Sequence, residues 1–185
     1  MKKAILITAF ATIVLLFSGK ARAEPGNGLA LMAGYAEHHY RLVQDTKADL
    51  IFTGTGIAFG MDFQFVVTDQ WSINTALQWS FENTTDIFNV PGNTEGTVFT
   101  YNAIFQTRYW FNNIYICPQI GIYYEIFTSH SDQVFSQRGV GGGFAVGWEG
   151  KNGWLVNLQY DLETAAPIGV DNIQIYRLLV GFRWK

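Results

Sequence analysis

The feature that most constrains this chain is an alternation of apolar and polar residues with a period of two, which recurs from Gly28 to the C-terminus. In residues 154–163 the even positions hold Trp, Val, Leu, Tyr and Leu, while the odd positions hold Leu, Asn, Gln, Asp and Glu. Because successive side chains of a β-strand point to opposite faces, this pattern predicts a strand with one apolar and one largely polar face. The chain is therefore expected to be all-β.

The same alternation predicts eight strands, of which the first is the least sharply patterned. They are expected at residues 28–39, 53–66, 71–82, 97–111, 114–127, 138–149, 154–164 and 172–184. Strands of soluble proteins usually have about five or six residues, whereas a tilted strand needs roughly 9–11 residues to cross a membrane. The predicted lengths therefore favour a sheet that spans a membrane.

The connections between these strands alternate between short and long. Tight turns rich in Asn, Asp and Gly are expected at residues 67–70, 112–113 and 150–153, and longer polar connections at 40–52, 83–96, 128–137 and 165–171. Short turns on one side and longer loops on the other are typical of outer-membrane barrels. The pattern predicts an eight-stranded antiparallel up-and-down transmembrane β-barrel.

The choice between a membrane barrel and a soluble one depends on which face is apolar. Here one face of each strand carries bulky aromatic and β-branched residues, and the other carries mainly Asn, Gln, Asp, Glu, Arg, Gly and Ser. The interior of an eight-stranded barrel is only just wide enough for side chains, so the small and polar set is expected inside and the bulky set in lipid. A soluble periplasmic barrel that binds a ligand in an apolar interior is the less favoured alternative.

Aromatic residues gather at the short-turn ends of the predicted strands. An aromatic girdle is expected from Trp71, Tyr109, Phe111, Trp148, Trp154 and Trp184. Aromatic rings favour the interface between lipid and water, so these residues predict the periplasmic boundary of the membrane. The opposite boundary is expected near Phe81, Phe99, Tyr124, Tyr160 and Tyr176.

The N-terminal segment is expected to be a secretory signal rather than part of the fold. A basic start is followed by an apolar stretch at residues 4–17, and Ala21-Arg22-Ala23 has the small-x-small pattern of a cleavage site. We expect residues 1–23 to be the signal peptide and residues 24–185 the barrel.

Charge and cysteine content exclude several classes of function. Without the four basic residues of the expected signal, the chain carries 8 basic and 15 acidic residues, a formal net charge of −7. This balance disfavours nucleic-acid binding. The single cysteine, Cys117, cannot form a disulfide within the chain, and no base partner for a catalytic thiol is evident.

Charged residues on the polar faces predict a network inside the barrel. They are Asp62, Glu82, Arg108, Glu125, Glu149, Asp161, Glu163, Arg177 and Arg183. Buried charges are tolerated when they are paired, and both signs are present. We interpret the set as packing that fills and orders a narrow lumen, with a catalytic cluster or an ion path as the alternative.

Glycines dominate the predicted inward face of residues 138–149. These are Gly139, Gly141, Gly143 and Gly147, accompanied by Ala145. We interpret the missing side chains as room for neighbouring rings such as Tyr115, Tyr123 or Trp110. A cavity for a lipid chain or a small ligand is the alternative.

The three histidines are interpreted as surface residues. His38 and His39 fall where the first strand meets its loop, and His130 falls in a long loop. Their spacing is not that of a metal site, so neither a metal nor a cofactor is expected.

The C-terminal segment carries a more specific signal. Residues Tyr176, Leu178, Val180, Phe182 and Trp184 alternate with Arg177, Leu179, Gly181 and Arg183. This tail resembles the signal that small eight-stranded outer-membrane proteins of the OmpA/OmpX-type barrel superfamily present to the barrel-assembly machinery, although Lys185 follows the terminal aromatic. The resemblance implies assembly from the periplasm into the outer membrane of a Gram-negative cell.

The resemblance does not imply one activity, because this fold serves several functions. Lipid A deacylases of this architecture carry a His-x-Ser pair near the end of their seventh strand, where this chain reads Gln159-Tyr160-Asp161. The expected function is therefore structural or surface interaction without an open pore or catalysis, and a lipid A-modifying enzyme is the alternative.

The expected partners follow from this location. They are outer-membrane lipid and lipopolysaccharide, the barrel-assembly machinery, and an extracellular partner at the long loops. A monomer is expected.

Overall fold

The computed structural model describes residues 26–42, 50–84, 96–129, 134–166 and 170–184. They form eight strands: β1 (Gly28–Leu42), β2 (Leu50–Thr68), β3 (Trp71–Thr84), β4 (Gly96–Phe111), β5 (Ile114–Ser129), β6 (Val134–Glu149), β7 (Trp154–Ala166) and β8 (Val170–Trp184). Each strand pairs antiparallel with the next, and β8 pairs with β1, which closes the barrel. The predicted fold class is confirmed. No helix in these described residues is long and apolar enough to cross a membrane.

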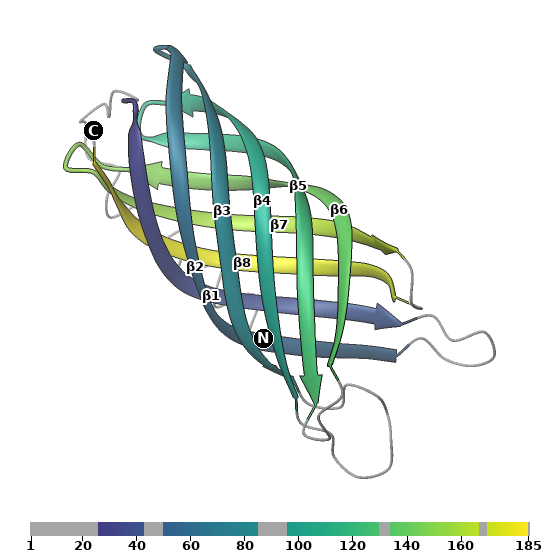
Figure 1. Cartoon of the computed structure of the whole chain (residues 1–185). Helices are drawn as coiled ribbons and strands as arrows, with labels where there is room; N and C mark the ends of the chain where they lie inside the picture. Colours follow the sequence, from purple (N-terminus) through teal and green to yellow (C-terminus); the bar gives the residue numbers. More distant parts are fainter. Residues whose placement is uncertain (1–25, 43–49, 85–95, 130–133, 167–169, 185) are drawn as a thin grey trace.

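The strands tilt around one another as a single ring (Figure 1). The short turns β2–β3, β4–β5 and β6–β7 lie at one end of the barrel, together with the start of β1 and the end of β8. We call this the turn end and the opposite end the loop end. Turn residues Asn112 and Gly153 have positive φ values of 58° and 87°, a conformation that Asn and Gly adopt most readily.

Several strands extend further at the loop end than the sequence predicts. β1 continues to Leu42, β2 begins at Leu50, β6 begins at Val134 and β8 begins at Val170, so the connections are shorter than expected. Backbone pairing continues to the pair Leu42↔Leu50, although the outward residues Glu37, His39, Thr53 and Thr55 that precede it are already polar. The prediction followed apolar alternation, which stops before the hydrogen-bonded ladder does.

The outer face carries a broad apolar band that ends sharply towards the loop end. The last apolar row consists of the directly paired residues Tyr35, Ile57, Phe81, Phe99 and Ile126. The next outward row is polar and consists of Glu37, Thr55, Asn83, Thr97 and Thr128, again paired strand to strand. We call this second set the polar row.

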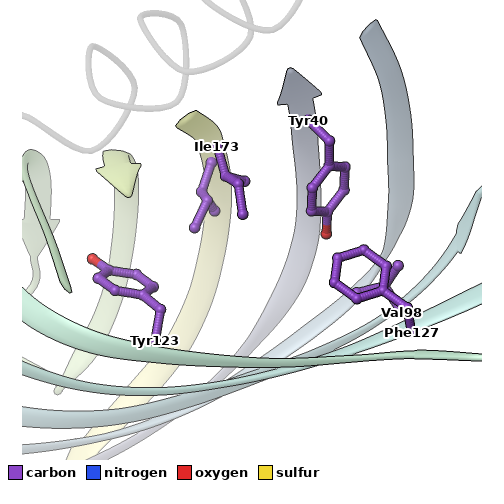
Figure 2. Packing of buried hydrophobic residues seen from close by; sticks show 6 residues of the cluster. Tyr40, Val98, Tyr123, Phe127 and Ile173 are labelled. Atoms are coloured by element: carbon purple, nitrogen blue, oxygen red, sulfur yellow. The ribbon is translucent and has the colours of Figure 1, made fainter. Parts of the chain in front are cut away.

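The interior is filled by side chains. From the turn end to the middle, a cluster of small and aliphatic residues from β1, β2, β7 and β8 includes Ala30, Ala36, Ala58 and Leu179. Closer to the loop end, Tyr40, Val98, Phe127 and Ile173 form an apolar plug, with Tyr123 and Ile175 beside it. Figure 2 shows these side chains projecting into the barrel from different strands.

Candidate functional site: the charged lumen

Charged side chains near the turn end form a balanced cluster. The Asp62 Oδ2 atom lies 2.6 Å from Arg108 Nη2 and 2.7 Å from Arg183 Nη2. Arg183 Nε lies 3.0 Å from Glu149 Oε2. We call Asp62, Arg108, Glu149 and Arg183 the turn-end cluster. It contains two acids and two arginines, so its formal charges cancel.

A small residue on β1 allows two distant strands to meet in this cluster. Ala30 is the register partner of both Asp62 on β2 and Arg183 on β8. Because the Ala30 methyl group is short, the Arg183 side chain passes over β1 to reach Asp62. Arg108 also lies 4.4 Å from the ring centre of Tyr115, where a cation–π contact is favourable.

Amide side chains connect opposite walls across the middle of the lumen. Gln78 on β3 donates to Gln159 on β7 over 2.9 Å, and Gln159 donates back over 3.1 Å. Gln106 donates to Gln119 over 2.8 Å, and Gln119 donates to Asp161 over 2.5 Å. These bonds leave the middle of the barrel crossed by side chains rather than open.

A second charged group, which we call the loop-end chamber, contains His38, Glu82, Glu125, Asp161, Glu163 and Arg177. Arg177 Nη1 lies 3.1 Å from Asp161 Oδ2, the His38 ring contacts Glu82 through Nδ1, and Gln137 donates to Glu125. Gly54, the register partner of His38, makes the His38–Glu82 contact feasible. A Cβ atom on Gly54 would lie 2.6 Å from Glu82 Oε2.

The structure places all the predicted lumen charges inside the barrel, each with 2% exposure or less. It brings them together as two groups at different depths. Strand parity predicts that these residues share one face, but it does not predict which strands they join. Within the described residues, no three His, Cys, Asp or Glu side chains are grouped to hold a metal ion.

The interpretation of His38 as a surface residue is wrong. Its side chain has 0% exposure and belongs to the loop-end chamber. The cause is the extension of β1 beyond residue 39, which keeps His38 on the inward face of a strand. His39 points outward, with Nε2 2.7 Å from Glu37 Oε1, and His130 lies outside the described residues.

Neighbouring side chains occupy the space that larger residues would need at the inward glycines of β6. A Cβ atom on Gly147 would lie 2.1 Å from the Tyr115 ring, and one on Gly141 would lie 2.8 Å from the Tyr123 ring. At Gly139 and Gly143 the corresponding positions lie 2.6 Å from Glu163 Oε1 and Asp161 Oδ1. The missing side chains make room for the Tyr115 and Tyr123 rings, as interpreted from the sequence, and also for two carboxylates, which that interpretation did not include.

The predicted girdle residues lie on the outer face at the turn end. Trp71, Phe111, Trp154 and Trp184 are 46–53% exposed, and Tyr109 packs between Trp71 and Phe111 with ring centres 4.7 and 4.6 Å apart. Trp148 differs from this expectation because only 7% of it is exposed. Its ring lies over Gly150, where an added Cβ would be 2.7 Å away.

The predicted assembly signal forms the outward face of β8. Trp184 and Phe182 pair in register with Leu29 and Leu31 of β1, so the end of this signal closes the barrel. Lys185 lies outside the described residues.

Comparison with known proteins supports the fold. No family model and no curated protein matches the sequence. Among solved structures, Ail of Yersinia pestis, determined in complex with the heparin analogue sucrose octasulfate, has 13% identity and a TM-score of 0.59, covering 86% of this chain and 100% of its own.

Two further structures give the same result. OprG of Pseudomonas aeruginosa has 11% identity and a TM-score of 0.55, covering 89% of this chain and 99% of its own. Neisserial surface protein A has 13% identity and a TM-score of 0.52, covering 85% and 96%. This chain therefore has the fold of the small eight-stranded outer-membrane barrels.

Proposed function

We propose that this chain is an integral outer-membrane β-barrel protein with a structural or surface-interaction role. The observation that carries the proposal is the exposed apolar band, to which every strand contributes. Ile57, Phe65, Ile120 and Val140 are each at least 59% exposed. Monomeric soluble proteins rarely expose apolar patches larger than a few hundred square ångströms, so a continuous band around a barrel requires lipid.

The same side chains that order the lumen argue against a pore. The turn-end cluster, the glutamine bridges and the apolar plug each occupy the lumen at a different depth. Steady conductance requires a continuous water-filled path, which a filled eight-stranded barrel lacks. We expect purified protein in a planar bilayer to show no large, steady conductance. A stable open level would contradict the closed-lumen proposal.

The location and partners form a second part of the proposal. Residues 1–23 would direct export, the β8 tail would be read by the barrel-assembly machinery, and the apolar band would contact outer-membrane lipid and lipopolysaccharide. The segments 40–52, 83–96 and 128–137 would provide the contact surface for an extracellular partner. Ail was determined with a heparin analogue, but the charge of −7 expected for the exported chain disfavours a polyanionic ligand here.

A lipid A-modifying enzyme remains the alternative, and the geometry offers it little support. Gln159 and Asp161 occupy the position where deacylases carry their pair, and both point into the lumen with 1% exposure or less. Asp161 is held there by Arg177, and Gln159 by Gln78. Mass spectrometry of lipid A from cells with and without the gene tests this alternative, because a gained or lost acyl chain would overturn the non-enzyme proposal.

Fractionation tests the membrane proposal itself. We expect the protein to sediment with outer membranes and to require detergent for extraction. We also expect its gel migration to differ before and after boiling, because a closed barrel resists detergent until heated. A protein that remains in the soluble fraction without detergent would contradict the proposal.

A further inference from the structure

The two charged groups of the lumen differ in their balance of charge. The turn-end cluster matches two acids with two arginines. In the loop-end chamber, Asp161 forms a salt bridge with Arg177, and Glu82 contacts the ring of His38. This pairing leaves Glu125 and Glu163, both 0% exposed, without a salt bridge of their own among the described residues, because Arg177 is already bonded to Asp161.

The carboxylate of Glu163 is the strongest indication that the chamber binds a cation. Neither of its carboxylate oxygens has a hydrogen-bond partner within the described part of the chain, and the same holds for Oε1 of Glu125. A buried carboxylate without partners is costly, because it has lost its hydration and gained nothing in return. A bound cation would offset that cost.

The two carboxylates lie beside each other over β6. Gln137 donates to Glu125, and the next inward residue of β6, Gly139, has Glu163 Oε1 where its own Cβ would be. Inward positions along a strand repeat every two residues, or about 6–7 Å. A cation with oxygen ligands at roughly 2.3–2.6 Å would bridge the pair once the two carboxylates rotate towards each other.

Further oxygen atoms adjoin the two carboxylates. Thr100 is the direct register partner of Glu125 and brings its hydroxyl group to the same level. The amide oxygen of Gln137 becomes a further ligand after rotation about its last bond, and water would complete the set. A site with only oxygen ligands, two of them carboxylates, suits calcium, which accepts six to eight oxygens in flexible geometry.

We propose that the loop-end chamber binds one calcium ion, with Glu125 and Glu163 as its carboxylate ligands. Of the apolar plug (Figure 2), Phe127 lies one inward step closer to the loop end than Glu125, and Ile173 is the register partner of Glu163. The ion would therefore enter as the barrel folds and exchange slowly afterwards. This inference concerns the lumen and goes beyond the proposed membrane role.

The test refolds the full chain from urea into phosphatidylcholine vesicles, with either calcium or EDTA present. After removal of free ions, elemental analysis measures calcium per folded chain, and urea titration measures the unfolding midpoint. We expect one calcium ion per chain and a higher midpoint with calcium. In the Glu125→Gln/Glu163→Gln double variant we expect bound calcium to fall to background and the midpoint to become independent of calcium.

Glu149→Gln serves as the matched control, because it removes a buried carboxylate from the turn-end cluster and should leave calcium binding intact. Gel migration before and after boiling verifies that each variant folds, and Glu163→Gln alone provides a milder change if the double variant does not. Absence of bound calcium in the native chain would overturn the proposal. So would equal calcium in native and double-variant protein, which would indicate binding to the lipid surface.

Discussion

Replacement of Asp62 by alanine is the sharpest test of the lumen network. One oxygen of Asp62 receives two arginines at 2.6 and 2.7 Å, and the other accepts from Asn74 Nδ2 at 2.9 Å. The substitution removes the carboxylate and leaves both guanidinium groups in a lumen where they are at most 1% exposed. Arg183 retains Glu149, but Arg108 retains only neutral partners and the Tyr115 ring.

The magnitude follows from the cost of breaking a buried ion pair. Removing one partner of such a pair typically destabilises a protein by about 3–5 kcal/mol. Because roughly 1.4 kcal/mol corresponds to a tenfold change in equilibrium, we expect the folding equilibrium constant of Asp62→Ala to fall about 100-fold to 5,000-fold.

The assay is reversible urea unfolding in phospholipid vesicles, followed by tryptophan fluorescence and gel migration. Asp69→Ala is the matched control, because Asp69 is exposed in the β2–β3 turn and its loss should change stability by less than about 0.5 kcal/mol. Asp62→Asn should lie between the two, because it keeps one acceptor oxygen. If Asp62→Ala unfolds at the same urea concentration as Asp69→Ala, the network does not stabilise the barrel.

Three further predictions concern packing, the lipid face and the thiol. Gly147→Ala should destabilise the barrel by about 1–3 kcal/mol, since its new methyl group would overlap the Tyr115 ring. Ile120→Arg places a charge at a position that is 62% exposed on the apolar band, so stability measured in vesicles should fall by roughly 2–4 kcal/mol. Cys117 has 0% exposure, so a maleimide should label the protein in urea but not in the folded barrel.

Each of these predictions has a control and an outcome that contradicts it. The new methyl group of Gly60→Ala would come no closer than 3.2 Å to the Met32 Cε and 3.4 Å to the Gln78 Cγ atom, so this variant should cost less than Gly147→Ala. Thr128→Arg, in the polar row, should cost about 0–1 kcal/mol. Equal losses for the two arginine variants would place the membrane boundary elsewhere. Rapid labelling of Cys117 without urea would show that the lumen admits reagents.

The sequence predicted the ring of strands well because lipid imposes a repeated pattern on every strand that crosses it. It predicted strand ends poorly where that pattern stops. Glu37 and His39 face outward beyond the apolar band, where strand residues are as polar as loop residues. The alternation of apolar and polar residues therefore no longer marks the strand, although His38 between them still faces the lumen.

The pairing inside the lumen could not be predicted for a different reason. Strand parity places Arg183 and Asp62 on inward faces, but their contact joins residues 121 positions apart and depends on the short side chain of Ala30 between them. Trp148 illustrates the same limit on the outer face. The alternation of the strand directs it outward, but its ring lies against the turn at Gly150 and only 7% of the residue is exposed.

Closure of β1 against β8 determines when during folding the barrel can be completed. Their register pairs run from Leu29↔Trp184 to Leu42↔Val170, so the first strand to be synthesised receives its second neighbour only after the last strand is complete. Contacts between such distant parts of a chain form slowly, because the intervening loop must be closed first. Until then both strands expose unpaired backbone edges that invite aggregation. The chain therefore depends on protection from aggregation between its synthesis and the closure of the barrel.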